Sequence, residues 1–263
     1  MAYLITEVDG HTPSTTEDVP TVTFENTSHC FAYTQSKLMM EFLDKWNLTP
    51  DFTAARFRMV NRMPLHTHEN ILSDLFTSPA VLATIKKQQH DDKLLSKLKF
   101  TKLNVTVMKM DFFNKLSINS EIITEEGGMV RGCMDEDIDG INIQDKLREM
   151  LLNPSSDNAN LFSENEKKEF LFHLLRLVCR GGSMMQAETE FKNYKEYTKK
   201  LYKDFITVQR GSSSGKIKIT SAVYKVESDV DGLFPNASPH NDFFVVIDDR
   251  TATIIYKPFA PFW

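Results

Sequence analysis

The stretch DFFVVIDDRTATIIYK, Asp242 to Lys257, decides the fold class of this chain of 263 residues. Two β-rich runs, DFFVVID and TATIIYK, meet around the polar residues at 248–250, which is typical of a β-hairpin. A third β-rich run, KIKITSAVYKVES at 216–228, precedes them. We therefore predict a small antiparallel sheet at the carboxyl-terminal end of the chain.

The sequence ahead of this sheet mixes helical and strand patterns without a regular βαβ order. This mixture predicts an α+β fold, with mixed helices and strands and the small C-terminal antiparallel sheet. Apolar spacing and capping residues predict helices at 36–46, 67–76, 78–88, 143–152, 163–180 and 187–205, and strands at 51–60 and 100–110.

The run LFSENEKKEFLFHLLRLVCRGG at 161–182 has the strongest helical pattern. Ser163 and Glu166 have the spacing of a capping box, in which each side chain binds the other residue's backbone N–H. Gly181 follows the last apolar turn, where a helix often ends in a left-handed residue. Its apolar residues cover more than one face, so we expect this helix to be buried on two sides.

The order of these segments suggests how the chain divides into domains. Residues 1–25 are predicted to form a mobile leader, because 10–21 are rich in Thr, Pro, Ser and Asp. Residues 26–263 are predicted to form a single α+β domain. If that domain consists of two sub-domains, the polar, glycine-bearing loop at 117–140 is where they divide.

Composition excludes several function classes. The net charge is −5 and no basic domain emerges, which argues against nucleic acid or an anionic membrane as the main partner. No run approaches about 18 consecutive apolar residues, so we expect no membrane span. The three cysteines are far apart and form no CxxC motif, which indicates free thiols in a reducing compartment.

The acidic stretch DEDIDG at 135–140 resembles the start of a calcium-binding EF-hand loop. Its three aspartates occupy positions one, three and five, where carboxylates bind Ca²⁺. Position twelve is Lys146, however, where a bidentate Glu is required. We therefore predict an acidic turn, with Asp139 or Asn142 capping the helix that follows.

Two other stretches resemble chemical sites. His66, His68 and Glu69 in LHTHEN are the residues of a possible metal-dependent enzyme, but THEN is more typical of a helix start, so we expect structural or surface histidines. In GSSSGKIKIT only three residues separate Gly211 and Gly215, and a strand follows, which excludes a phosphate-binding loop. We predict no catalytic residue, metal or cofactor, and so no enzyme.

A row of lysines is the first candidate surface for partner binding. The lysines recur at helical spacing within 187–205 and line one face of the predicted helix. Such a face is either simply solvated or docks an acidic partner. The residues concerned are Lys192, Lys195, Lys199 and Lys203.

The terminal stretch KPFAPFW is the second candidate surface. Phe259, Phe262 and Trp263 place three aromatic rings at a chain end, where residues normally fray. Either these rings close over the core, or they form a docking segment, since aromatic side chains are common anchors at protein interfaces.

A family resemblance rests on four runs between about 166 and 248, in this order: EKKEFLFHLLRLVCRGGSMMQAE, YTKKLYKDFITVQR, GKIKITSAVYKVES and FPNASPHNDFFVVID. They resemble the cilia- and flagella-associated protein 300 family. These are packing motifs, and the resemblance carries no catalytic residue.

The resemblance implies a non-enzymatic interaction protein needed for the assembly or transport of axonemal outer and inner dynein arms in motile cilia and flagella. It implies a location in the cytoplasm and the axoneme. Axonemal dynein chains and dynein preassembly co-chaperones are the implied partners, with no nucleic acid and no membrane. The alternative within this reading is a structural component of the axoneme.

Overall fold

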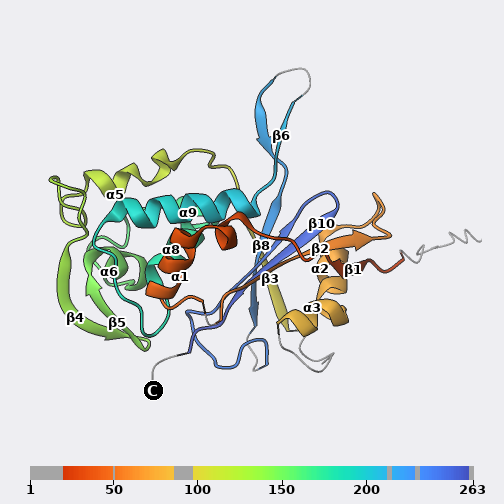
Figure 1. Ribbon diagram of the computed structural model, residues 1–263, viewed down its shortest axis with the longest axis horizontal. Helices are drawn as coiled ribbons and strands as arrows, with labels where there is room; N and C mark the ends of the chain where they lie inside the picture. Colours follow the sequence, from red (N-terminus) through yellow and green to blue (C-terminus); the bar gives the residue numbers. More distant parts are fainter. Residues whose placement is uncertain (1–19, 50, 86–96, 212–214, 229–231, 261–263) are drawn as a thin grey trace, which may run out of the picture.

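A six-stranded antiparallel sheet forms the centre of the protein (Figure 1). The computed structural model describes residues 20–49, 51–85, 97–211, 215–228 and 232–260. Across the sheet, the strands are β1 (Thr23–Asn26), β2 (Thr53–Val60), β10 (Thr251–Lys257), β9 (Asp242–Ile247), β8 (Ala222–Ser228) and β3 (Leu98–Leu103).

The hairpin of β9 and β10 lies in the middle of this sheet. Its turn closes where Asp248 N donates to the carbonyl oxygen of Thr251 at 2.9 Å. Every residue of β9 is buried, which explains its nearly continuous apolar sequence. The predicted α+β class with a C-terminal antiparallel sheet is confirmed. The sheet is larger than predicted because β1, β2 and β3 pair onto it from the first 103 residues.

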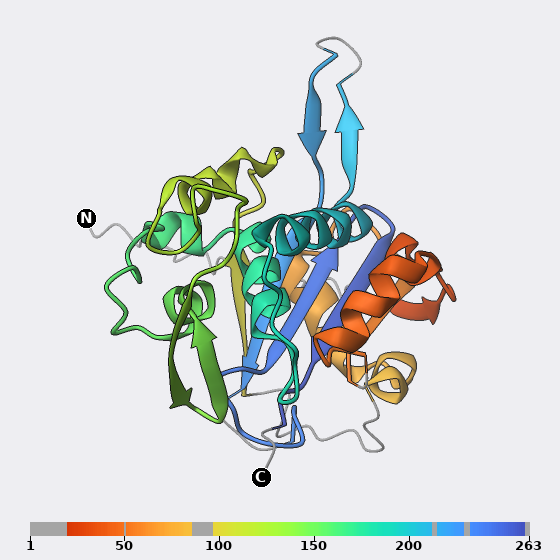
Figure 2. The ribbon, with the colours of Figure 1, turned by 60° about the vertical axis from the view of Figure 1, so that its left-hand side comes forward.

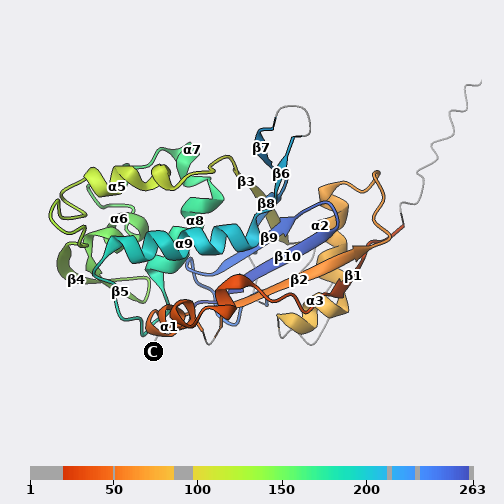
Figure 3. The same ribbon diagram turned by 45° about the horizontal axis from the view of Figure 1, so that its top comes forward.

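Helices cover both faces of the sheet (Figures 1 and 3). Alternate side chains of β9 enter two separate core clusters, Phe244 and Val246 on one face and Phe243 and Val245 on the other. The first face packs against α1 (Lys37–Lys45), α8 (Phe170–Arg180) and α9 (Phe191–Phe205), and the second against α2 (His68–Thr77) and α3 (Pro79–Thr84).

Several predicted elements are confirmed with their caps. The helices at 36–46, 67–76, 78–88 and 187–205 correspond to α1, α2, α3 and α9, and the strand at 51–60 to β2; residues 86–88 lie outside the described residues. The side chain of Ser36 accepts a hydrogen bond from Met39 N at the start of α1. Thr67 and Asn70 form a capping box at the start of α2.

The helix predicted over 163–180 is wrong in one respect, because it is broken in two. The capping box of Ser163 and Glu166 opens a short helix, α7 (Glu164–Lys167). Glu169 is then extended, and its carboxylate accepts hydrogen bonds from the backbone N–H and the hydroxyl of Thr106. Phe170 N donates to the carbonyl oxygen of Asn104 at 2.9 Å. The hydrogen bond that this residue would make in a continuous helix is therefore made to the segment that follows β3.

The same contact ends the strand predicted over 100–110. β3 stops at Leu103, and the residues that follow bond to the break before α8 instead of to a strand. Smaller elements complete the fold (Figure 2). They are η1 (Ala32–Gln35), η2 (Met110–Phe113), α5 (Asn114–Ile118), β4 (Gly132–Ile138), β5 (Ile141–Asp145), α6 (Lys146–Leu152), β6 (Val208–Arg210) and β7 (Ile217–Ile219).

The predicted domain division stays a prediction. Residues 1–19 of the proposed leader lie outside the described residues, while β1 begins at Thr23 and pairs with β2. Within the proposed loop at 117–140, residues 132–138 form β4. Trp46, Phe113 and Phe170, which come from both sides of that loop, share one core cluster.

Two further observations bear on the sequence predictions. Among the described residues, no helix is both long enough and apolar enough to cross a membrane. Cys30, Cys133 and Cys179 are free thiols, as predicted, and Cys179 is fully buried in α8.

Candidate interaction site

The four candidate lysines lie on α9, and their spacing places them on one face of the helix. The opposite face of α9 is buried against the core, so the helix is amphipathic along its whole length. The buried residues are Phe191, Tyr194, Tyr197, Thr198, Leu201 and Phe205.

Two of these lysines have acidic neighbours. Lys192 Nζ lies 2.6 Å from the carboxylate of Glu190, and this hydrogen bond raises the pKa of Lys192. Lys199 Nζ lies 3.4 Å from the carboxylate of Glu196, one turn earlier on α9. Both pairs are solvent-exposed, so neither contributes much to the stability of the fold.

The other two lysines form no ion pair with a carboxylate in the described part of the chain. Lys195 Nζ lies 3.3 Å from the side-chain oxygen of Asn114 at the start of α5, which orients it without neutralising it. Lys203 is exposed near the end of α9. The face therefore carries net positive charge at these two residues, on a protein that is acidic overall.

The terminal aromatic segment is placed only in part. Phe259 is 2% exposed, and its backbone N–H donates to the side-chain oxygen of Asn241 at 2.7 Å. The guanidinium of Arg180 lies 5.7 Å from the ring centroid, a cation–π distance. Phe259 therefore belongs to the core in this structure. Phe262 and Trp263 lie outside the described residues, so their docking role stays a prediction.

His240 packs beside Phe259, with ring centroids 5.4 Å apart. Burial, together with the nearby charges of Arg176 and Arg180, lowers the pKa of His240 to about 4. Its Nε2 lies 3.8 Å from the carboxylate of Asp139, but a neutral imidazole forms no ion pair at neutral pH. Neither ring nitrogen has a hydrogen-bond partner among the described residues.

The stretch DEDIDG forms part of the β4–β5 hairpin rather than a calcium loop. Asp139 and Gly140 form the turn, with φ angles of 52° and 80°. Asp137 accepts a hydrogen bond from Gly140 N at 3.3 Å, and Asp135 accepts one from Gln144 at 3.2 Å. The segment leading into the turn is a strand, so the entering helix of an EF-hand is replaced by β4.

The predicted cap of the following helix is wrong by a few residues. Neither Asp139 nor Asn142 caps α6; Asp145 does, and its side chain accepts a hydrogen bond from Arg148 N at 2.8 Å. The strand β5 continues through Asn142 to Asp145, which moves the start of α6 to Lys146. Strand pairing with β4 therefore decided where the helix begins.

The residues of LHTHEN do not converge on a metal site. His66 is buried, and its Nδ1 accepts a hydrogen bond from Met63 N at 2.8 Å. His68 is the first residue of α2, and its Nδ1 lies 2.7 Å from the hydroxyl oxygen of Tyr224. Across the described ranges, no group of three potential ligands has metal-binding geometry, so the metal-dependent alternative gains no geometric support.

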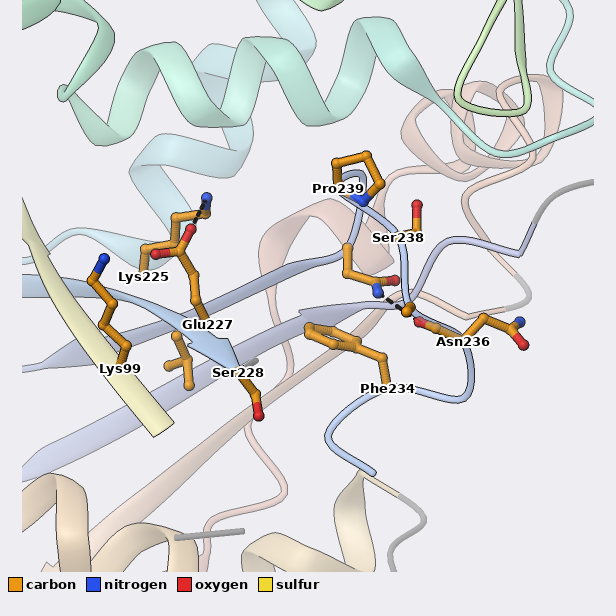
Figure 4. A pocket seen from close by; sticks show the side chains of 11 residues that line it. Lys99, Lys225, Glu227, Ser228, Phe234, Asn236, Ser238 and Pro239 are labelled. Atoms are coloured by element: carbon orange, nitrogen blue, oxygen red, sulfur yellow. Dashed lines mark hydrogen bonds and ion pairs between the residues drawn. The ribbon is translucent and has the colours of Figure 1, made fainter. Parts of the chain in front are cut away.

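A polar pocket of about 450 Å³ lies between the β3–β8 edge of the sheet and the loop that leads to β9 (Figure 4). Lys99 and the ion pair of Lys225 with Glu227, 2.6 Å apart, stand on one side. The amide of Asn241 donates to the carbonyl oxygen of Asn236 at 2.8 Å on the other side. The lining includes no histidine or cysteine, and the pocket offers mainly hydrogen-bonding groups.

Sequence reasoning missed this pocket because its walls come from distant parts of the chain. Lys99 lies on β3, whereas the opposite wall is built from residues 234–241. No local sequence pattern indicates that these segments lie close together. The pairing of β3 with β8 places Lys99 beside the end of β8, from which the chain continues to the opposite wall.

Comparison with known proteins identifies the family to which the chain is related. The family described as "Cilia- and flagella-associated protein 300" matches residues 21–257. The chain belongs to this family. The matched residues include the whole six-stranded sheet and the helices on both of its faces. The family's sequence pattern therefore extends over the entire fold described above.

Two curated relatives are both described as "Cilia- and flagella-associated protein 300". The one from Chlamydomonas reinhardtii is 30% identical over 246 residues, which cover 88% of this chain and 93% of the relative. The one from Paramecium tetraurelia is 28% identical over 230 residues, covering 86% and 90%. No solved structure matches. The family's description associates these proteins with cilia and flagella and names no enzyme activity.

Proposed function

We propose that this member of the cilia- and flagella-associated protein 300 family is a non-enzymatic interaction protein. It supports the assembly or transport of axonemal outer and inner dynein arms in motile cilia and flagella. The observation that carries the proposal is the family match over residues 21–257.

The surface of α9 is consistent with a role in binding other proteins. Lys195 and Lys203 present positive charge at one side of the molecule and form no ion pair among the described residues. Electrostatic complementarity of this kind sets association rate and specificity more than it sets raw affinity. We propose axonemal dynein chains and dynein preassembly co-chaperones as partners, met in the cytoplasm and in the axoneme.

The absence of an enzyme activity is part of the proposal. The lining of the polar pocket includes no histidine or cysteine, and His66 and His68 bind different groups. Binding and orientation of partner proteins require neither a cofactor nor a metal. We propose no contact with nucleic acid or with a membrane.

Electron microscopy of axoneme cross-sections from cells lacking the protein tests the proposed function. We expect outer and inner dynein arms to be missing from otherwise normal doublets. Re-expression of the wild-type protein should restore them. Intact arms on the doublets of such cells would refute a role in arm assembly.

Salt extraction distinguishes an assembly or transport factor from a structural part of the axoneme. We expect most of the protein to appear in the soluble fraction of cell bodies and to leave isolated axonemes in high salt, because charged surface contacts are screened by salt. Retention on axonemes alongside tubulin after that wash would favour a structural component.

A further inference from the structure

A second surface feature lies beyond the end of α9, where the hairpin of β6 and β7 projects from the body of the protein (Figures 2 and 3). A groove of about 450 Å³ runs between this hairpin, the last turn of α9 and the segment around Met108. Its apolar lining consists of Met108, Tyr202, Ile206, Val208, Ile217 and Ile219.

The hairpin presents its apolar side chains on one face only. Val208 pairs with Ile219 across the two strands, so both point to the same side, and both line the groove. Gln209 and Lys218 form the alternate pair and point to the opposite side. This alternation is typical of a strand pair with one buried face, yet Val208 and Ile217 on the apolar face are exposed.

The apolar residues of the groove are unusually exposed for their type. Met108 is 57% exposed, Val208 52% and Ile217 48%. A cluster of large apolar side chains at one place on a surface is typical of an interaction site. The floor is ordered, because the hydroxyl of Tyr202 donates to the carbonyl oxygen of Val107 at 2.9 Å.

The rim of the groove is positively charged. Lys109 and Lys203 are part of its lining, and Arg210 stands directly opposite Ile217, on the apolar side of the hairpin. Within the described ranges, these three side chains form no ion pair, and no acidic residue lines the groove. An occupant with apolar side chains and flanking carboxylates would therefore match both its floor and its rim.

The charge of the rim also decides between classes of occupant. A second copy of this chain, bound through the same groove, would bring two identical, positively charged rims together, because such a contact uses the same surface on both subunits. Like charges at an interface are unfavourable. Nucleic acid would leave the apolar floor uncovered.

We propose that the groove between the end of α9 and the β6–β7 hairpin is a docking site for an acidic peptide segment of a partner protein. The apolar side chains of that segment pack on Val208, Ile217 and Met108. Its Asp and Glu residues lie beside Lys109, Lys203 and Arg210. The proposal rests on the groove alone and holds whether or not the partner belongs to the dynein arms.

Peptide selection on the purified full-length chain tests this docking site. A phage-displayed library of random peptides long enough to span the groove is selected, and enriched peptides are synthesised and titrated by fluorescence anisotropy. We expect enriched peptides to combine apolar residues with an excess of Asp and Glu. Their affinity should fall as the salt concentration rises, because the rim contacts are electrostatic.

Substitutions on the two faces of the hairpin locate the binding. Val208→Asp and Ile217→Asp should each lower the affinity at least about tenfold, as expected for central apolar contacts. The matched control is Gln209→Asp, which adds the same charge on the opposite face of β6 and should leave the affinity unchanged. Thermal unfolding of each variant shows whether the fold is retained, and Lys203→Glu provides a second test that leaves the hairpin untouched.

Several outcomes would overturn the proposal. These are no enrichment, enriched peptides without an acidic excess, or an affinity that Val208→Asp and Lys203→Glu leave unchanged. Sedimentation velocity adds another: a dimer that Val208→Asp dissociates would assign the groove to a second copy of the chain. Failure of this site would leave the arm-assembly function untouched, since that function is tested by microscopy of cells lacking the whole protein.

Discussion

Arg180 at the end of α8 and Asp242 at the start of β9 form a fully buried ion pair, with Nη1 and Oδ2 2.6 Å apart. Arg180 also donates to the carbonyl oxygens of Gly181 and His240. Burial lowers the pKa of Arg180, against the opposing effect of Asp242. One ion pair thus joins the helical layer to the middle of the sheet.

Removal of one partner should therefore be costly. Asp242→Ala should lower the free energy of unfolding by about 3–5 kcal/mol, because it leaves Arg180 buried without a counter-ion. Asp249→Ala is the matched control, since this carboxylate is exposed in the neighbouring turn and its loss should cost less than about 0.5 kcal/mol. Urea denaturation followed by circular dichroism measures both; equal stabilities would show that the ion pair contributes little.

Stability should fall as the pH is lowered from neutral, before most carboxylates titrate. Burial lowers the pKa of both His173 and His240 to about 4, from an ordinary value of 6.5. Both are neutral when folded, so the unfolded chain binds more protons between those pH values, and stability present above 6.5 is lost towards 4. We expect a loss of up to about 3 kcal/mol for each histidine across this window.

Urea denaturation at a series of pH values measures this loss. The free energy of unfolding of the double variant His173→Gln, His240→Gln should depend less steeply on pH above about 5. An unchanged slope in the double variant would rule out the histidines as the cause.

The ion pair of Glu166 with Lys115 affects stability in a lower pH range. It lowers the pKa of Glu166 to about 2, so its contribution to stability is lost only as the pH falls below the ordinary value of 4.5.

The double glycine after α8 is required by a close backbone contact. Gly182 N donates to the carbonyl oxygen of Trp46 at 2.9 Å, and a Cβ on Gly182 would lie 2.1 Å from the carbonyl oxygen of Asn47. Gly182→Ala should therefore lower the free energy of unfolding by about 3 kcal/mol, since neither backbone can move aside easily.

A matched glycine shows whether this effect is specific. Gly132 in β4 has a negative φ, and its nearest neighbour to a new Cβ is at an ordinary 3.7 Å. Gly132→Ala should change stability by less than about 0.5 kcal/mol. If chemical denaturation gives both variants the same midpoint, the contact with Asn47 is not a tight one.

Charge reversal on α9 should weaken binding to the proposed dynein partners. The double variant Lys195→Glu, Lys199→Glu should reduce capture of dynein chains in a pull-down about tenfold, because it replaces two cations by two anions on one face. Lys37→Glu, on the exposed side of α1, is the control and should bind normally. Undiminished capture by the double variant would leave this lysine face simply solvated.

Truncation at the carboxyl end should distinguish residues that pack in the core from residues that bind a partner. Phe259→Ala, or deletion of 259–263, should lower the free energy of unfolding by about 3–5 kcal/mol, because the ring is buried against His240 and Arg180. Deletion of 261–263 alone retains Phe259. A shorter chain of normal thermal stability that loses partner binding would support the docking role of Phe262 and Trp263.

Local sequence signals predicted much of the fold. The capping residues Ser36, Thr67 and Ser163 begin the helices predicted for them, because caps depend on neighbours within three residues. The apolar runs of β9 and β10 predicted the central hairpin. The break before α8 was not predictable, since it depends on the hydrogen bonds of Glu169 with Thr106, 63 residues away.

The surfaces were predictable only where a single helix carries them. The lysine spacing on α9 is visible in the sequence, and the helix is where it was expected. The docking groove is not visible, because Met108, Val208 and Ile217 come from separate segments. An acidic strand such as β4 also escapes prediction, since its residues are mostly exposed and it lacks an alternating apolar pattern.

The order of the strands has a consequence for synthesis on the ribosome. The edge strand β1 and its neighbour β2 leave the ribosome first, whereas β9 and β10, which join them to β8 and β3, leave last among the described strands. Until then β2 and β8 each lack a neighbour, and unpaired strand edges favour aggregation. The sheet therefore cannot close until its central hairpin has emerged, and a frameshift within that hairpin would remove the middle of the sheet.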